Sequence, residues 1–396
     1  MIAHSLIASL SQSHGLLISL LESVPEADTR RVYHPSLAPL AWYFGRAVYL
    51  ELYWLRERSH GDDNLTTRVR HLFARGHIPY AEAVAAMPHA DHLMNWALEI
   101  FDDDLMRLAN PTEADDATVA DAGRIVDYLT QALSRIYEDM VLVLVERQIA
   151  AVDAGAGHEV QVPLVPRLPG ADATQVDQGH YRIGARDGVV FDNELPPMAV
   201  ELHNFRVQRE PVSNAEFLAF LVDGGYENAT WWSEAGNDWR ERTRYAAPHH
   251  WRRDAAGRWF GVGVNGAADL VADDPVHGIS RYEAEAFANW AASRGEAMSG
   301  AVLQHEFQWE VAARAGHLGS AGRVWEWCAN GFEPYASYEA PADPEMVTSE
   351  FDGTHAAVRG AALHTQPPIR RASYRNRALP DERHLLSGAR LVLPPL

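Results

Sequence analysis

Two parts of this sequence follow different hydrophobic patterns, and that difference limits how the chain can fold more than any other feature. Before about residue 150, apolar side chains recur at intervals of three and four residues, which is typical of amphipathic helices. Four such segments can bury their apolar faces against one another as a bundle. We therefore predict helices over residues 5–24, 35–58, 90–109 and 118–152, with Pro35 near the start of the second.

The pattern changes at Ala154. Residues 154–179 are rich in glycine and proline, which predicts a linker. From His180 onward short apolar runs alternate with Gly, Pro and Asn, and nine of the 12 tryptophans fall in this part. We expect short helices over residues 214–222 and 281–294 and otherwise loops held by aromatic packing. The predicted fold class is α+β, with a helical bundle over residues 1–153, a linker over 154–179 and a loop-rich domain over 180–396.

The basic residues of this chain, apart from histidine, are all arginine. The sequence has 34 Arg and no Lys against 54 Asp and Glu, which gives a formal net charge of −20. Without lysine the chain cannot form a Schiff base with pyridoxal phosphate, nor use the phosphate-binding lysine of a Walker A motif or a kinase. The negative charge opposes binding to nucleic acids and anionic membranes, so neither is expected as a partner.

Cysteine content and apolar runs indicate the compartment. Cys328 is the only cysteine, so the chain cannot form an internal disulfide. No apolar run reaches the roughly 20 residues that a membrane-spanning helix needs. Residues 1–6 lack the basic region of a signal peptide. These features predict a protein of the reducing cytoplasm.

Both parts of the chain resemble known domains. In the second part the matching segments occur in family order, and together they resemble the formylglycine-generating-enzyme-like domain, a variant of the C-type-lectin fold. These segments are residues 191–196, 211–217, 275–284, 306–310, 324–327, 374–376 and 387–390. In the first part, residues 34–46 are similar to the motif of DinB-type four-helix bundles that usually ends in Trp-His-Leu-Gly-His.

A DinB-like bundle followed by such a domain resembles the ergothioneine-type sulfoxide synthases. The resemblance implies a non-haem iron enzyme that joins a thiol, or in a related branch a selenosugar, to the imidazole of hercynine. It further implies three histidine ligands, one on the second helix and a His-x-x-x-His pair on the fourth. Here those positions hold Arg46, Ala132 and Ile136. Arginine stays protonated, and alanine and isoleucine have no donor atom, so we expect neither the family's iron nor another cofactor.

The same alignment suggests which residues surround the former metal position. Ala132 and Ile136 are expected in the bundle core. If the alignment holds, Arg46 points into the former cavity, where it pairs with Glu138 or an acidic ligand, or else it turns outward. Tyr137 and Glu138 follow the second lost ligand and are candidates for ligand binding.

Fewer candidates lie in the second domain. Tyr335 matches a family segment near the substrate, which makes it the one catalytic candidate, with aromatic packing as its alternative. Arg375 and Asn376 match the family's Arg-Asn pair and either shape a cleft or serve the structure. Polar site residues have changed elsewhere, since the family's Arg-Gly-Gly-Ser reads Arg-Gly-Ala-Ala over residues 359–362. Cys328 is expected to be a small buried residue.

Three further patterns are interpreted as decoys. Residues 261–266 satisfy G-x-G-x-x-G, but no crossover helix follows them. The pairs His89/His92 and His249/His250 each lack a third ligand at useful spacing and lie in surface-like sequence. The acidic run 102–104 is expected on a solvated helix face.

Three hypotheses about function remain at this point. The first is a metal-free pseudo-enzyme or binding protein, whose cleft between the two domains holds a small molecule or a partner. The second is an active enzyme that forms a carbon–sulfur or carbon–selenium bond on hercynine with a rearranged iron site. The third is a subunit that stabilises an active paralogue.

Overall fold

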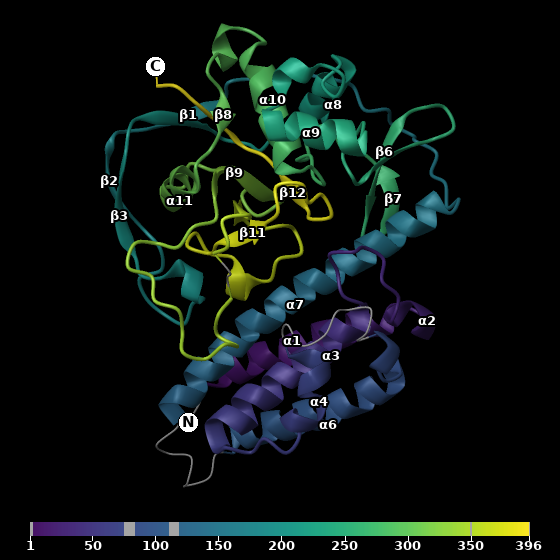
Figure 1. Ribbon diagram of the computed structural model, residues 1–396, viewed down its shortest axis with the longest axis vertical. Helices are drawn as coiled ribbons and strands as arrows, with labels where there is room; N and C mark the ends of the chain where they lie inside the picture. Colours follow the sequence, from purple (N-terminus) through teal and green to yellow (C-terminus); the bar gives the residue numbers. More distant parts are fainter. Residues whose placement is uncertain (1–2, 75–83, 111–118, 349–350, 396) are drawn as a thin grey trace. The chain divides into compact units, whose positions relative to one another are not determined.

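The computed structural model describes residues 3–74, 84–110, 119–348 and 351–395. The chain divides into two compact units (Figure 1). The first comprises Met1–Arg147 and Gln366–Ile369, and the second comprises Gln148–Thr365 and Arg370–Leu396. Helices dominate the first unit and short strands with helices make up the second, which confirms the α+β class. No helix of the described ranges has both the length and the apolar character needed to cross a bilayer.

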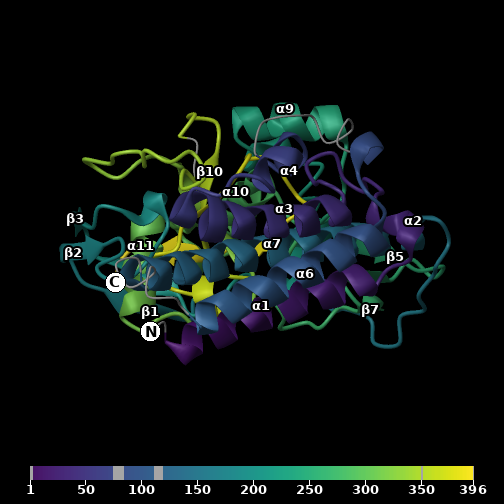
Figure 2. The same ribbon diagram turned by 90° about the horizontal axis from the view of Figure 1, so that it is seen from below.

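The first unit is built from long helices that run side by side (Figure 2). The central one, α3, is buried at every position, which explains why it contacts several other helices instead of presenting one apolar stripe. A π-helical turn continues it. The described helices of this unit are α1 (His4–Glu22), α2 (Glu26–Thr29), α3 (Leu40–Leu52), η1 (Tyr53–Arg58), α4 (Thr66–Phe73), α6 (Ala90–Ala109) and α7 (Val119–Asp153), of which the residues from Gln148 onward belong to the second unit.

The predicted start of the second helix is wrong. Pro35 does not open a helix; α3 begins at Leu40, directly after Pro39. Proline disfavours helical geometry at the residue before it, so Ala38 cannot belong to a regular helix that runs through Pro39. The sequence also did not predict α2 or α4, which are short and follow no long apolar repeat.

In the second unit, the described strands form two four-stranded sheets, a two-stranded sheet and a three-stranded sheet. Their orders are β1-β4-β13-β8, β11-β10-β9-β12, β2-β3 and β5-β6-β7. All these pairs are antiparallel except β12 with β9. The strands are β1 (Ala173–Val176), β2 (Gly179–Ile183), β3 (Met198–Leu202), β4 (Phe205–Gln208), β5 (Trp251–Arg253), β6 (Trp259–Gly263), β7 (Gly266–Asp269), β8 (Val302–Leu303), β9 (Trp325–Gly331), β10 (Ala356–Gly360), β11 (Asn376–Ala378), β12 (Ser387–Gly388) and β13 (Leu391–Leu393).

The helices of this unit begin at side-chain caps and pack through aromatic rings. Ser213 and Ser280 each accept a hydrogen bond from the backbone three residues on and complete a capping box with a glutamate. In the core of these helices the ring of Phe217 stacks on Phe287, and Trp290 contacts Phe287 at a tilt. The helices are α8 (Asn214–Val222), α9 (Glu234–Thr243), α10 (Arg281–Ala292) and α11 (Glu306–Arg314), with short 3₁₀ turns η3 (Asp192–Glu194), η4 (Ala229–Trp231) and η5 (Glu296–Met298), and η6 (Pro367–Ile369) in the segment assigned to the first unit.

Two sequence predictions need correction here. The segment 154–179 is not linker throughout, because Ala173–Val176 forms β1 and pairs with β4, a partner about thirty residues away that local composition does not reveal. The helices α9 and α11 were not predicted. α9 is short and polar, and α11 is short and follows irregular chain. The G-x-G-x-x-G pattern lies in the hairpin of β6 and β7, where Gly263 pairs with Gly266, and no helix N-terminus is present there.

Candidate functional site

The helices α3 and α7 run antiparallel. Contacts near their ends show how high along the bundle axis the expected iron-ligand positions lie. The rings of Trp54 and Tyr128 are in edge contact, with centroids 5.4 Å apart. Near the other end of α7, Arg147 donates to Asp28, which precedes α3 in the chain, at 2.7 Å. Arg46 and Ile136 each lie eight residues, or about 12 Å along the axis, from the ring contact. Both therefore lie at the same level of the bundle.

Arg46 has a structural partner at this level. Its side chain is buried, and Nη1 donates a 2.8 Å hydrogen bond to the carbonyl of Phe73, the last residue of α4. One helical turn earlier, Trp42 Nε1 donates to the carbonyl of Leu72 at 2.9 Å. Carbonyls at a helix C-terminus lack partners within the helix and carry partial negative charge, so a guanidinium stabilises them. The alternative that Arg46 turns outward is wrong, because the end of α4 holds it inside.

Gly45 fits the same contact. A Cβ atom at this position would lie 2.3 Å from the ring of Phe73, closer than any side chain permits. The ring therefore packs directly on the backbone of α3 while the carbonyl of the same residue receives Arg46. The Gly-Arg dipeptide serves the docking of α4 onto α3.

The other expected ligand positions offer no donor. Ile136 is buried and Ala132 is partly buried, and neither side chain can bind a metal. Tyr137 is half-buried, and burial raises the pKa of its hydroxyl. Glu138 is buried on the same helix. Within the described part of the helical unit, no three His, Cys, Asp or Glu side chains place ligand atoms within 4.8 Å of one another. This donor set does not fit the family's iron.

A second group of buried polar residues joins α1, α3 and α6, and the sequence did not predict it. His14 Nε2 and Glu51 Oε2 share a 2.8 Å hydrogen bond, and the His14 ring stacks flat on Phe101. Arg56 Nε donates to Asp104 at 2.9 Å. The prediction that residues 102–104 lie on a solvated helix face is therefore wrong for Asp104, which is only 1% exposed. The signal that could have revealed the cluster is Glu51, an acid inside the apolar run 47–55.

Asp104 keeps one oxygen, Oδ2, without a hydrogen-bond partner in the described structure. Burial, and after it the negative charge of Glu51, raise the pKa of Asp104 to about 7, although Arg56 opposes the shift. The carboxyl is therefore partly protonated near neutral pH. In the unfolded chain its pKa returns to about 3.9.

This shift predicts a pH-dependent stability. Between pH 4 and 7 the native state holds a proton on Asp104 that the unfolded state releases, so the free energy of unfolding falls by about 1.4 kcal/mol per pH unit. The loss is complete above pH 7. Asp104→Asn removes this contribution, and urea unfolding from pH 4.5 to 8 should show a correspondingly flatter profile. Glu51, Arg56, Asp103 and His14 also face the cluster and remain in both proteins.

Asp103→Asn is the matched control, because Asp103 also binds Arg56 but is half-exposed. It should leave the slope of stability against pH unchanged. If Asp104→Asn and Asp103→Asn give the same profile as the unchanged chain, Asp104 does not titrate as described.

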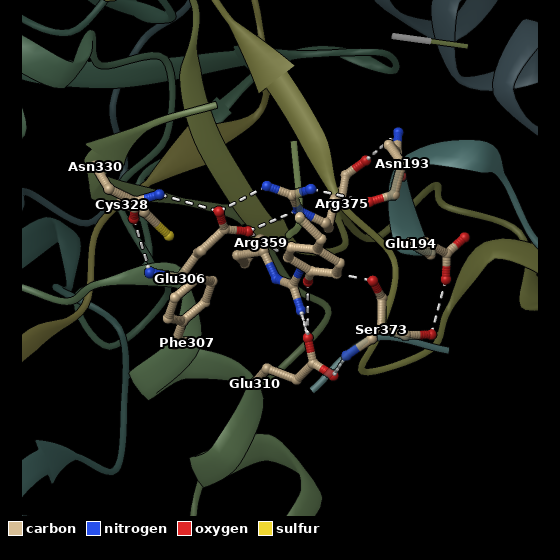
Figure 3. A network of polar contacts seen from close by, with 12 residues as sticks. Asn193, Glu194, Glu306, Phe307, Glu310, Cys328, Asn330, Arg359, Ser373 and Arg375 are labelled. Carbon is tan, nitrogen blue, oxygen red and sulfur yellow. Dashed lines mark hydrogen bonds and ion pairs between the residues drawn. The ribbon is translucent and has the colours of Figure 1, made fainter. Parts of the chain in front are cut away.

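Among the polar candidates of the second unit, Arg375 belongs to a buried ion-pair network (Figure 3). Glu306, at the start of α11, receives two hydrogen bonds of 2.8 Å from Arg375 and one of 3.0 Å from Asn330. Arg359 on β10 donates to Glu310 on the next turn of α11 at 2.6 Å. Burial alone would raise the pKa of Glu306, but Arg375 and Arg359 outweigh it and lower the pKa. The network ties α11 to the β9–β10–β11 sheet.

The structure brings Tyr335 and Arg375 together inside this network. Arg375 lies over the Tyr335 ring at 4.1 Å and is also bound to two backbone carbonyls. Tyr335 is 3% exposed within an apolar cluster, and burial raises its pKa. Asn376 opens β11, one residue beyond, and is partly exposed. These surroundings favour packing for Tyr335 and a structural role for Arg375.

The prediction that Cys328 is a small buried residue is confirmed. Trp325 and Trp327 lie on β9 and are buried, and Trp327 Nε1 donates to the carbonyl of Ile279 at 2.8 Å. Cys328 is fully buried beside them, and burial raises the pKa of its thiol, so the thiolate that a nucleophile needs is disfavoured.

Comparison with known proteins gives the class of the second unit first. Residues 161–321 match the sulfatase-modifying factor enzyme 1-like domain, which begins inside the segment predicted as linker. A solved structure of PvdO from Pseudomonas aeruginosa aligns at 16% identity with a TM-score of 0.39, covering 60% of this chain and 100% of PvdO.

Two of the relatives are named hercynine oxygenase. A hercynine oxygenase from Mycolicibacterium smegmatis is 26% identical over 426 residues, which cover 93% of this chain and 94% of the relative. A hercynine oxygenase from Mycobacterium tuberculosis is 30% identical over 247 residues, which cover 51% of this chain and 55% of the relative. Over most of its length the chain is similar to hercynine oxygenases, which agrees with the resemblance of its motifs to the ergothioneine-type sulfoxide synthases.

Proposed function

We propose that this chain is a member of the family that does not use the family's iron and acts as a binding protein, for a small molecule or for a protein partner. The observation that carries the proposal is the buried guanidinium of Arg46 on the carbonyl of Phe73. A ferrous ion at this level would have to bind beside the fixed positive charge of Arg46, and neither Ala132 nor Ile136 offers it a donor atom. The side chains there support helix packing, and they do not support redox chemistry.

Hercynine is the first small molecule to test, because the relatives are named for an activity on it. Oxygen uptake should be measured with hercynine, a thiol and added ferrous iron, with the Mycolicibacterium smegmatis hercynine oxygenase as the positive control. We expect no uptake above buffer. Isothermal titration should give the same hercynine affinity, or the same lack of binding, with and without iron. Hercynine-dependent oxygen uptake by this chain would contradict the proposal.

An active sulfoxide or selenoxide synthase with a rearranged iron site is the second candidate. The observation that favours it is the 26% identity to a hercynine oxygenase over 93% of the chain. The same oxygen-uptake experiment, repeated with a selenosugar in place of the thiol, separates the two candidates. If neither turnover nor hercynine binding is found, co-purification from the native host tests the role of a subunit that stabilises an active paralogue.

A further inference from the structure

His250 is a buried histidine with one ring nitrogen that has no partner. The sequence placed the pair His249/His250 in a surface-like segment, but His250 is 0% exposed, so that interpretation is wrong for it. The Nδ1 atoms of His250 and His277 share a hydrogen bond of 2.7 Å. His250 Nε2 has no hydrogen-bond partner in the described structure. A buried polar atom in this state destabilises the fold unless a ligand satisfies it.

The backbone at Gly278 and His249 leaves room for the ring of His250 and fixes its position. The carbonyl of Gly278 accepts a 2.7 Å hydrogen bond from the amide of His249, which fixes the short segment ahead of β5. Gly278 itself has a φ of +78°, and a Cβ atom there would lie 2.6 Å from His250 Nδ1. Only glycine combines this conformation with this close approach. The position of His250 is therefore built by the fold.

The two neighbouring rings can act together. A ring nitrogen of His249 lies within 4.8 Å of one of His250, and His249 is partly exposed, so its ring can turn without opening the core. A metal-bound histidine usually donates its second ring N–H to an acceptor that fixes its tautomer. His277 Nδ1 is placed to be that acceptor, which leaves the Nε2 lone pair of His250 for the metal.

We propose that His249 and His250 bind a divalent transition-metal ion of the zinc, nickel or copper type, with His277 as the positioning residue behind His250. Imidazole nitrogens suit these ions, and water or an exogenous ligand would complete the coordination. The site uses residues of the second unit and does not depend on the proposal for Arg46.

Zinc titration of the full chain, in competition with a chromogenic chelator, tests the site. We expect one Zn²⁺ per chain. Loss of a partner that orients a metal ligand weakens binding by roughly 10- to 100-fold, so His277→Asn should fall in this range. His249→Asn and His250→Gln, which each remove a ligand nitrogen, should weaken binding at least as much. In the copper-loaded protein, electron paramagnetic resonance should show coupling to imidazole nitrogen. His249→Asn and His250→Gln should each reduce this coupling.

His89→Asn/His92→Asn is the matched control, because it removes two exposed histidines from α6. It should leave zinc affinity unchanged. Circular dichroism checks that each variant is folded. If His250→Gln does not fold, His249→Asn still tests the site, because His249 is partly exposed. No zinc binding by the unchanged chain, or zinc binding that His249→Asn leaves intact while His89→Asn/His92→Asn removes it, would overturn the proposal.

Discussion

The triple variant Arg46→His/Ala132→His/Ile136→His is expected to bind ferrous iron in the helical unit. Residues 132 and 136 are one turn apart on α7, so two imidazoles would project from one helix face. The contact between Trp54 and Tyr128 places residue 46 at the level of residue 136. A three-imidazole site of this kind should bring iron binding from undetectable to a Kd of about 1 μM or tighter, about −8 kcal/mol. Anaerobic titration with a ferrous chelator as competitor measures it.

The matched control keeps Arg46 and carries only Ala132→His/Ile136→His. It should bind iron far more weakly, because the third ligand is missing and the positively charged guanidinium of Arg46 stays buried in the bundle. Equal iron binding by the double and triple variants would mean that residue 46 does not reach the site. Circular dichroism before titration checks that the larger side chains at residues 132 and 136 have not unfolded the bundle.

Arg375→Ala should destabilise the second unit by about 3–5 kcal/mol, the usual cost of removing one partner of a buried ion pair. The change leaves Glu306 buried with Asn330 and a 3.5 Å contact to Arg359 in place of two 2.8 Å hydrogen bonds. It also frees the carbonyls of Asn193 and Glu333, which Arg375 now binds. Urea unfolding followed by tryptophan fluorescence measures the loss.

Arg323→Ala is the comparison for this experiment. Arg323 pairs with Asp274 at 2.7 Å, a distance like that in the buried network, but both side chains are more than a third exposed. Exposed pairs contribute about 0–1 kcal/mol. A loss for Arg375→Ala no larger than for Arg323→Ala would show that the network does not hold α11 to its sheet.

Local signals explain what the sequence could predict. The helices over residues 90–109 and 214–222 have the predicted bounds, because the apolar spacing is encoded within each segment and Ser213 caps the second helix. The order of short motifs in the second part gave the lectin-like class for the same reason. The predicted start of the second helix was five residues too early, because the helix begins only after Pro39.

Burial of single polar residues could not be predicted in this way. Asp104 is enclosed because Arg56 reaches it from another helix, and His250 is enclosed because Gly278 allows its ring to approach. Arg46 finds its partner at the end of α4, a helix that the sequence did not predict. In each case the decisive neighbour is more than 20 residues away, and no spacing within the segment records it.

Iron content is the most direct test of the central claim, that the Arg46 position does not hold the family's metal. The full chain and its His249→Asn/His250→Gln variant should be incubated anaerobically with ferrous iron, washed with a weak chelator and measured by plasma mass spectrometry. We predict that the variant retains only trace iron, because Arg46, Ala132 and Ile136 provide no ligand. One iron per chain retained by that variant would contradict the account.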